Sequence, residues 1–354
     1  MTGDNMNIYN SRIFMSDIER TAQSMDLEKL YGSSVLITGA SGLICSGIAD
    51  ILFYVNTEKN AGIDIYLAGR SEEKMCERFS RYADTPHYHF VSYDAAEASR
   101  FDFYADYIIH GASNASPGAI QREPVETMTD NIMGVKNLLE YAKSAAAKRL
   151  LFVSSSEVYG NTGRSEPFME SDYGYTDILN PRSSYSVGKM AAETMCVSFT
   201  HEYGLDTVIA RPGHIYGPTA SRADNRVASL FAYAAAQRQD LVLKSDGAQL
   251  RSYCYMLDCD SAILTILLKG DSGEAYNISN PESVMTIRQM AERYAEYGGV
   301  KLIFDMPTSE EIAAFNPMAN SSLDSRKLIK LGWRGLFGGE EGIGHTVSIL
   351  KEII

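Results

Sequence analysis

The side chains best suited to acid–base chemistry are a tyrosine and a lysine four residues apart. Tyr185 and Lys189 occur in Ser184-Tyr-Ser-Val-Gly-Lys189, which opens an apolar-patterned segment that we predict to be helical. Residues four apart share one face of a helix, so the Lys189 ammonium would lower the pKa of the Tyr185 phenol from about 10. Tyr185 is therefore a candidate general base, although the same spacing is common in surface helices.

A second group of polar side chains follows an apolar segment in the middle of the chain. Residues 150–154 are predicted to form a strand, and Ser155, Ser156 and Glu157 come directly after it. Ligands of parallel α/β sheets bind beyond the carboxyl ends of the strands, so these hydroxyls and this carboxylate would face a ligand. The alternative is that the hydroxyls only cap the end of the strand.

A glycine turn near the start of the chain predicts a dinucleotide site. Gly39, Ser41 and Gly42 stand between a β-rich run, 34–38, and a segment with helical spacing. Glycine lets the backbone approach a pyrophosphate, whose charge is met by free N–H groups at the helix N-terminus. The third position of the fingerprint is Cys45 instead of glycine, and an ordinary tight turn is the alternative.

The residues after the second predicted strand bear on which dinucleotide is bound. That strand, 63–68, is followed by Gly69-Arg70-Ser71, without the acidic residue that usually contacts the ribose of NAD. An Arg and a hydroxyl suit the 2′-phosphate of NADP, so NADP is slightly favoured over NAD, with a solvated loop cation as the alternative for Arg70. The positive nicotinamide would reinforce the effect of Lys189 on Tyr185.

An α/β fold must position these residues. Besides the segments above, strands are expected at 89–92, 107–110 and 207–210, and helices at 43–55, 72–82, 124–147 and 185–203. Strands that alternate with helices at this spacing predict a Rossmann-like, doubly wound parallel sheet.

Three parts are expected along the chain. Residues 1–33 form an N-terminal arm with an amphipathic helix over 17–30, and residues 34–212 form the dinucleotide-binding domain. The later alternation is irregular, which predicts a smaller mixed α/β substrate domain over 213–354, with 251–270 returning to the main domain.

Composition excludes several classes of function. The 354 residues include 32 Lys and Arg against 45 Asp and Glu, and the formal charge of −13 opposes nucleic-acid binding. No apolar stretch is long enough to span a membrane and no secretory signal is evident, so we expect a cytoplasmic protein without a membrane partner. The five cysteines form no CxxC pair, which favours reduced thiols and argues against a metal site.

Taken in order, the motifs resemble those of extended short-chain dehydrogenase/reductases that modify nucleotide sugars. The similarity spans about residues 34–290 and adds these motifs to those above: His110-Gly-Ala112, Asn131-x-x-Gly134-x-x-Asn137, Arg211-Pro-Gly-His-Ile-Tyr-Gly-Pro218 and Arg251-Ser-Tyr. The resemblance implies a nucleotide-diphosphate sugar as substrate, Ser155 as the hydroxyl partner of Tyr185, and a homodimer paired through helices 124–147 and 185–203.

The same resemblance assigns the remaining site residues. The implied cofactor-binding residues are Gly39, Ser41, Gly42, Leu43, Ile44, Arg70, Ser71, Asp94, Ala112 and Lys189, with Asp94 near the adenine and Lys189 on the ribose. The implied substrate-binding residues are Ser113, Ser156, His214, Arg226 and Arg251. His214 replaces the usual Asn near the glycosyl phosphate and is otherwise a core histidine, whereas Arg251 suits bidentate binding of a diphosphate.

The residues after Ser155 bear on the reaction. Ser156-Glu157 is similar to UDP-glucuronate decarboxylases and also to GDP-mannose 4,6-dehydratases. Two further stretches resemble the decarboxylases: His110-Gly-Ala-Ser-Asn-Ala-Ser-Pro117 and Asn180-Pro-Arg-Ser-Ser-Tyr185. The resemblance implies oxidation of the sugar at C4 by bound NAD(P), followed by decarboxylation with Glu157 assisting proton transfer. The alternatives are a nucleotide-sugar 4-epimerase or 4,6-dehydratase, an NADPH-dependent 4-keto-sugar reductase, and a non-catalytic dinucleotide-binding protein.

Overall fold

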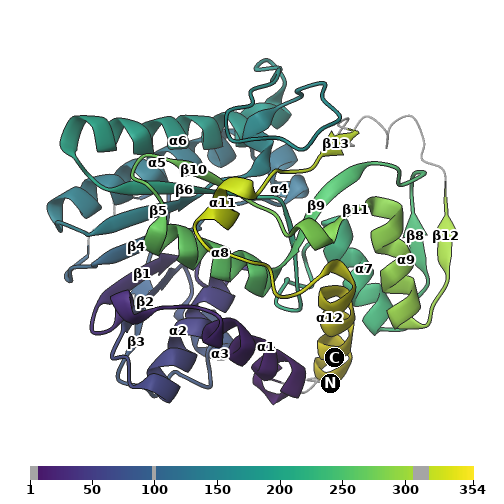
Figure 1. The fold of residues 1–354 in the computed structure, drawn as a ribbon, viewed down its shortest axis with the longest axis horizontal. Helices are drawn as coiled ribbons and strands as arrows, with labels where there is room; N and C mark the ends of the chain where they lie inside the picture. The colour runs from purple at the N-terminus through teal and green to yellow at the C-terminus, as the bar shows by residue number, and fades with distance from the viewer. Residues whose placement is uncertain (1–6, 98–100, 306–318) are drawn as a thin grey trace.

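A parallel sheet forms the centre of the larger part of the molecule (Figure 1). The computed structural model describes residues 7–97, 101–305 and 319–354. The strands are β1 (Ser34–Thr38), β2 (Asp64–Gly69), β3 (Tyr88–Ser92), β4 (Tyr107–His110), β5 (Arg149–Val153), β6 (Thr207–Pro212) and β10 (Ala275–Ile278). They form a seven-stranded sheet in the order β10-β6-β5-β4-β1-β2-β3, and every neighbouring pair is parallel. This confirms the predicted doubly wound α/β fold.

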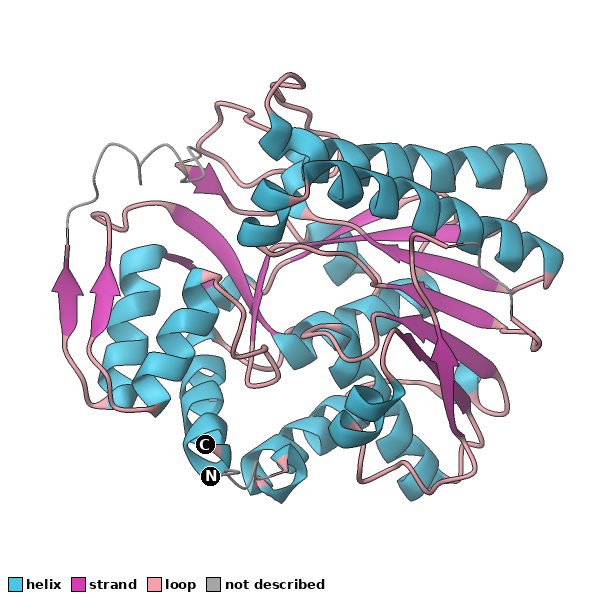
Figure 2. Cartoon of the chain, turned by 180° about the vertical axis from the view of Figure 1, so that it is seen from behind, coloured by secondary structure: helices cyan, strands magenta, loops and turns pink. Residues whose placement is uncertain are grey.

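Helices cover both faces of this sheet, as the two opposite views show (Figures 1 and 2). One face carries α2 (Cys45–Lys59), α3 (Glu72–Arg78) and α8 (Met256–Lys269), and the other carries α5 (Pro124–Ser144) and α6 (Ser184–Tyr203). Successive strand residues point to opposite faces. Ile37 accordingly packs with Ile48 of α2, whereas Leu36 packs with Val135 of α5. Both faces are buried, which explains why the strands are apolar throughout.

The smaller part is built around a mixed sheet. Its strands are β7 (His214–Tyr216), β9 (Leu250–Tyr255), β11 (Val284–Thr286) and β13 (Asn320–Ser321), and β8 (Leu241–Leu243) pairs with β12 (Leu302–Phe304). The helices of this part are α7 (Val227–Ala236), α9 (Ile287–Gly298) and α12 (Gly339–Ile353). α4 (Pro117–Arg122) packs near α5, and α11 (Arg326–Lys330) packs near β10. Residues 306–318 of the predicted substrate domain lie outside the described residues.

The chain crosses between the two parts more than once. Within the segment predicted to return to the main domain, β9 belongs to the smaller sheet, whereas α8 packs on β5 and β6 of the large sheet. β10 also joins the large sheet beside β6, although no such strand was predicted. The domain limits 34–212 and 213–354 stay a prediction.

The N-terminal arm begins its helix earlier than predicted. α1 spans Arg12–Gln23 instead of 17–30, because the Ser11 side chain caps it by accepting from the backbone N–H of Phe14. A separate 3-10 turn covers Glu28–Leu30. α1 packs on α2, α8 and α12, and the two ends of the described chain lie close together (Figure 1). Residues 1–6 of the arm lie outside the described residues.

Candidate active site

The glycine turn after β1 is shaped for close backbone approach. Gly39 has φ +68°, and a Cβ there would lie 2.9 Å from the Cα of Ala112 at the end of β4. The turn is also tied to β2, because Gly39 N–H donates to Ala68 O at 3.1 Å. No side-chain hydrogen bond caps the N-terminus of α2 at Ile44. A narrow backbone cradle beside uncapped helix N–H groups fits a dinucleotide pyrophosphate.

The other residues predicted in this turn line the same corner. Ser41 and Gly42 are exposed, Leu43 is buried, and Ile44 is half-buried. Cys45, the departure from the glycine fingerprint, is 2% exposed, and a Cβ on Gly111 would come to 2.2 Å from its Sγ. The absence of a side chain at Gly111 therefore makes room for the thiol at the third position.

Arg70, Ser71 and Asp94 lie at the ends of β2 and β3, beside α5. Ser71 caps α3 by accepting from the backbone N–H of Lys74, whereas Arg70 and Asp94 are exposed. Burial and the nearby Asp94 carboxylate raise the pKa of Asp130 on α5, and Arg70 lowers it. The Arg70 guanidinium therefore faces carboxylates as well as solvent, which reduces the net positive charge available to a phosphate.

The structure brings Ser155, Tyr185 and Lys189 together where β5 ends. Ser155 caps η3 (Ser156–Tyr159), and its hydroxyl lies near enough to Tyr185 to lower the pKa of the phenol. Lys189 Nζ donates to Val153 O at 2.9 Å and lies 5.8 Å from the centre of the Tyr185 ring. The one-face placement predicted from the four-residue spacing is thus present in the fold.

Burial is the largest influence on the pKa of Tyr185 in this structure. Burial raises the pKa of Tyr185 to about 12, and the Glu157 carboxylate adds to the increase. The Ser155 hydroxyl and the guanidinium groups of Arg226 and Arg182 act in the opposite direction. Burial also lowers the Lys189 pKa to about 7, so this amine carries only part of a positive charge near neutral pH. Among the groups of the chain itself burial dominates, and the lowering of the phenol pKa by Lys189 together with the nicotinamide stays a prediction.

Glu157 has a partner that the sequence analysis missed. Both of its carboxylate oxygens accept from Arg182, through Nη1 and Nη2 at 2.8 Å each. Arg182 lies in η4 (Pro181–Ser183), directly before α6. The signal was present in Asn180-Pro-Arg, three residues before Tyr185, but the stretch was given no chemical role. Ser156, next to Glu157, is 7% exposed.

Three predicted substrate-binding residues meet on the smaller part of the molecule. His214 opens β7, Arg251 lies on β9, and Arg226 precedes α7. Burial, followed by the charges of Arg251 and Arg226, lowers the pKa of His214 to about 3. Its Nδ1 is buried without a hydrogen-bond partner among the described residues. A neutral histidine between two guanidinium groups suits a phosphate or diphosphate.

Arg226 connects this region to the tyrosine, because its charge acts on both Tyr185 and His214. It also pairs with Asp224 at 2.6 Å. Ser113 donates to Asn131 Oδ1 at 3.0 Å. The assignment of these residues to substrate stays a prediction.

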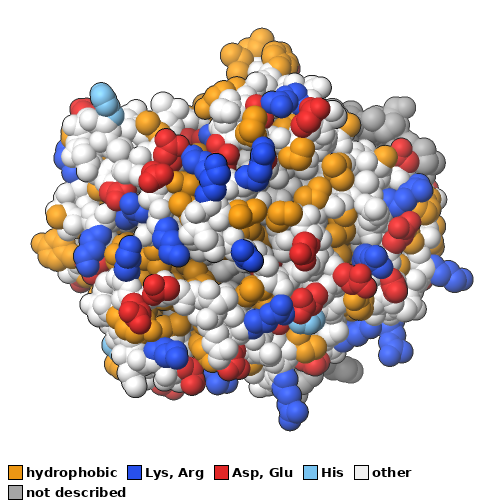
Figure 3. Space-filling view, in the orientation of Figure 1, with side chains coloured by type: hydrophobic (Ala, Val, Ile, Leu, Met, Phe, Trp, Pro, Cys, Tyr) orange, Lys and Arg blue, Asp and Glu red, His pale blue; other side chains and the backbone are white. Residues whose placement is uncertain are grey.

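A cavity of about 1330 Å³ lies elsewhere, lined by Met190 and Val197 of α6, Arg211 of β6 and Lys327 of α11. None of the predicted site residues lines it, so the candidate site is defined by the clustered polar groups and not by cavity size. Among the described residues no group of three or more His, Cys, Asp or Glu side chains could hold a metal ion. None of the described helices has the length and apolarity needed to cross a membrane. On the face drawn in Figure 3, Lys and Arg side chains are interspersed with Asp and Glu.

Several known proteins are similar to this chain in sequence. UDP-glucuronic acid decarboxylase 6 of Arabidopsis thaliana is 33% identical over 264 residues, which cover 74% of this chain and 73% of the plant protein. UDP-glucuronic acid decarboxylase 1 of Danio rerio is 29% identical over 320 residues, covering 89% of this chain and 72% of the fish protein.

Solved structures show the same fold. UDP-glucose 4-epimerase of Thermotoga maritima superposes with a TM-score of 0.76 at 24% identity, over 90% of this chain and 99% of that one. A dTDP-glucose 4,6-dehydratase of Streptomyces venezuelae also gives 0.76, at 23% identity over 90% and 97% of the two chains. Residues 35–279 match the family described as the NAD dependent epimerase/dehydratase family. The chain, with its parallel sheet, glycine turn and Tyr185–Lys189 helix, belongs to the NAD dependent epimerase/dehydratase family.

Proposed function

We propose that this protein is an enzyme that oxidises a nucleotide-linked sugar at C4 and then removes its C5 carboxylate as CO2, with UDP-glucuronate as the substrate. The observation that carries the proposal is the grouping of Ser155, Tyr185 and Lys189 at the end of β5, with the Glu157 carboxylate two residues away from Ser155. Relatives that carry the name UDP-glucuronic acid decarboxylase support this choice of reaction.

In this mechanism Tyr185 removes the proton of the sugar C4 hydroxyl. The Ser155 hydroxyl orients the Tyr185 oxygen, and the burial of Tyr185 keeps water from competing for the proton. Because the Tyr185 pKa is about 12, the reaction needs positive charge near the phenol, and Arg182 and Arg226 supply part of it. A bound oxidised NAD(P), held at the glycine turn around Gly39, would supply a hydride acceptor and further positive charge.

The C4 ketone then makes the C5 carboxylate labile. The bond between C5 and the carboxylate breaks, its electron pair moves into an enolate, and CO2 leaves. A proton must then return to C5, and Glu157 lies near enough to Tyr185 to orient the donor of that proton. The C4 ketone would finally be reduced by return of the hydride, with the C4 oxygen taking back the proton held by Tyr185, so that the product differs from the substrate only by the loss of CO2. His214 and Arg251 would hold the diphosphate on the smaller part of the molecule, so that the sugar extends toward Tyr185.

A panel of nucleotide sugars with product mass spectrometry tests the proposal. We expect UDP-glucuronate to lose one CO2, whereas loss of one water would indicate a dehydratase and an unchanged mass with altered stereochemistry an epimerase. Unchanged UDP-glucuronate would refute the decarboxylase assignment. Tyr185→Phe should abolish turnover, and a Phe variant as active as the parent would exclude this mechanism.

The cofactor preference rests on Arg70. Its exposed guanidinium at the end of β2 supports binding of the 2′-phosphate of NADP. The Asp130 carboxylate, on which the Arg70 charge acts, disfavours that phosphate. We propose a modest preference for NADP, which Asp130→Asn should strengthen. Equal affinity of the parent for NAD and NADP would refute it. An NADPH-dependent 4-keto-sugar reductase is the second candidate, and stoichiometric loss of NADPH absorbance with a 4-keto nucleotide sugar would favour it.

We also propose a homodimer through α5 and α6. The two helices pack together, and they expose Met128, Met133 and Val197 to solvent. Exposed apolar side chains on neighbouring helices favour burial against a second copy. Sedimentation as a monomer at micromolar concentration would refute this.

A further inference from the structure

The ion pair between Glu157 and Arg182 has a fixed geometry. Two parallel hydrogen bonds of 2.8 Å join the two carboxylate oxygens to the two terminal guanidinium nitrogens. Such fork-to-fork pairing restricts both position and orientation, which a single contact from a lysine would not. The Glu157 side chain is 29% exposed and that of Arg182 is 41% exposed, so solvent reaches the pair.

Each member of the pair is anchored on its own segment. The backbone N–H of Glu157 donates to Ser155 Oγ at 3.1 Å, and the backbone N–H of Arg182 donates to Asn180 Oδ1 at 3.0 Å. Glu157 belongs to the segment that carries Ser155, and Arg182 to the turn that leads into the helix of Tyr185. The pair therefore cross-links the two segments whose side chains meet at the Tyr185 hydroxyl.

The pair also sets the charge around Tyr185. Glu157 from η3 raises the Tyr185 pKa, whereas Arg182 from η4 and Arg226 before α7 lower it. Lys189, on Tyr185's own helix, lies 5.8 Å from the ring and is only partly ionised near neutral pH. Loss of one partner of the pair would leave the other charge uncompensated beside the phenol.

We propose that Arg182 is a positioning residue, which clamps the Glu157 carboxylate beside the substrate and balances its charge next to the Tyr185 hydroxyl. The inference rests on the proposed function, because it takes Tyr185 as the proton acceptor. Both Glu157 oxygens accept from the guanidinium, so the clamp fixes the carboxylate as a hydrogen-bond acceptor. Arg182 acts through Glu157 and Tyr185 and need not touch the sugar.

The test is the pH dependence of kcat/KM for holoenzyme variants, with the nucleotide sugar that the panel identifies. Arg182→Gln should lower kcat at neutral pH. The limb of the profile on which kcat/KM rises with pH should move to higher pH by about half a unit to one unit, which is the shift expected from one unit charge acting across a partly hydrated site. Glu157→Gln should move the same limb to lower pH. Arg182→Lys should return the limb to the parental pH but leave kcat severalfold reduced, because the ammonium restores charge and not the fork.

Arg164→Gln is the matched control. Arg164 is also 41% exposed and pairs with a carboxylate, that of Asp172, in the neighbouring loop. Its loss should change neither kcat nor the limb. If Arg182→Gln behaves like Arg164→Gln while the parent decarboxylates its substrate, the clamp is wrong and the proposed function stands.

If no sugar is converted, the proposed function fails and unfolding still tests the clamp. Arg182→Gln, Glu157→Gln and the double variant are then compared by the midpoint of urea unfolding. The double variant should lose less than the sum of the two single losses, because each single change already breaks the pair. Additive losses would overturn the clamp.

Discussion

Lys189→Met should stabilise the protein while it abolishes turnover. Lys189 is 2% exposed, and its amine donates to Val153 O and lies 4.7 Å from the centre of the Phe152 ring. Burial lowers its pKa from 10.5 to about 7, although the Glu193 carboxylate acts in the opposite direction. The fold therefore keeps an amine at a place that disfavours its charged form.

The shift of the Lys189 pKa from 10.5 to about 7 sets the expected change in the free energy of unfolding. At 1.36 kcal/mol per pH unit, it corresponds to a folding cost of roughly 5 kcal/mol when the amine is charged in both states. Methionine has a similar length and no charge, but it leaves Val153 O without its donor, which costs about 1–3 kcal/mol. We therefore expect a net gain of about 2–4 kcal/mol below pH 7.

The sign of the pH dependence follows from the same values. Between pH 7 and pH 10.5 the unfolded chain keeps a proton on Lys189 that the folded chain has released. Stability of the parent therefore rises with pH across this window, as the cost of burying the charge disappears. The advantage of the Met variant should be greatest below pH 7 and should vanish, or reverse, toward pH 10.5.

Urea unfolding of the parent and Lys189→Met, followed by circular dichroism at several pH values, measures this difference. Lys148→Met is the matched control, because the Lys148 amine is 57% exposed and pairs with Asp106 on the surface. Lys148→Met should not increase the free energy of unfolding. The reasoning is refuted if Lys189→Met is no more stable than the parent below pH 7, or if its advantage does not change with pH.

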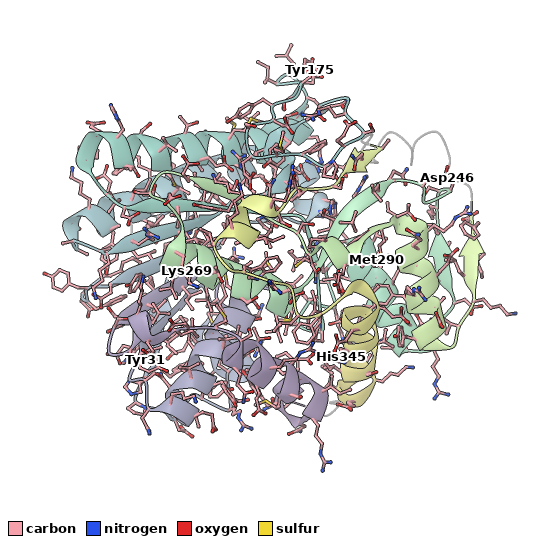
Figure 4. The ribbon with its side chains drawn as sticks, in the orientation of Figure 1. Tyr31, Tyr175, Asp246, Lys269, Met290 and His345 are labelled. Carbon is pink, nitrogen blue, oxygen red and sulfur yellow. The ribbon has the colours of Figure 1, made fainter. Side chains whose placement is uncertain are left out.

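Three further predictions concern the arm, the C-terminal helix and the glycine turn. Arg78→Met should cost about 3–5 kcal/mol in urea unfolding, because it leaves the buried Asp50 carboxylate with the Tyr9 hydroxyl but without its ion pair; a loss below about 1 kcal/mol would contradict this. The Asp17 carboxylate on α1 accepts a hydrogen bond from His345 Nδ1 on α12 and raises the pKa of His345 (Figure 4). The stabilisation that His345→Gln removes should therefore be full below pH 6.5 and should decline as pH rises through the raised pKa. A stability difference that does not depend on pH would be inconsistent with this prediction. Gly39→Ala should abolish cofactor binding in calorimetry, because its Cβ would meet Ala112, whereas Gly32→Ala, with similar φ but nothing within 4 Å, should bind normally; normal binding by both variants would disprove the close approach.

Local patterns predicted the elements that carry the site. Apolar runs and glycine positions predicted β1, β4 and α6 with limits that differ from the structure by at most a residue at either end. The arm helix was misplaced by five residues at its start and seven at its end, because its N-cap, Ser11, lies in a polar stretch without a strong pattern. β10 was missed because a four-residue edge strand has too little periodicity to be recognised without its neighbour β6.

The sequence by itself determined which residues lie close along the chain: the i, i+4 spacing of Tyr185 and Lys189, and the turn that requires Gly39. Tertiary structure alone decided their electrostatics, because burial and charge pairing depend on segments far apart in sequence. It raised the Tyr185 pKa to about 12, lowered the Lys189 pKa to about 7, and joined Glu157 to Arg182, 25 residues later in the chain. Desolvation is a property of the folded environment, so no spacing in the sequence could reveal its size.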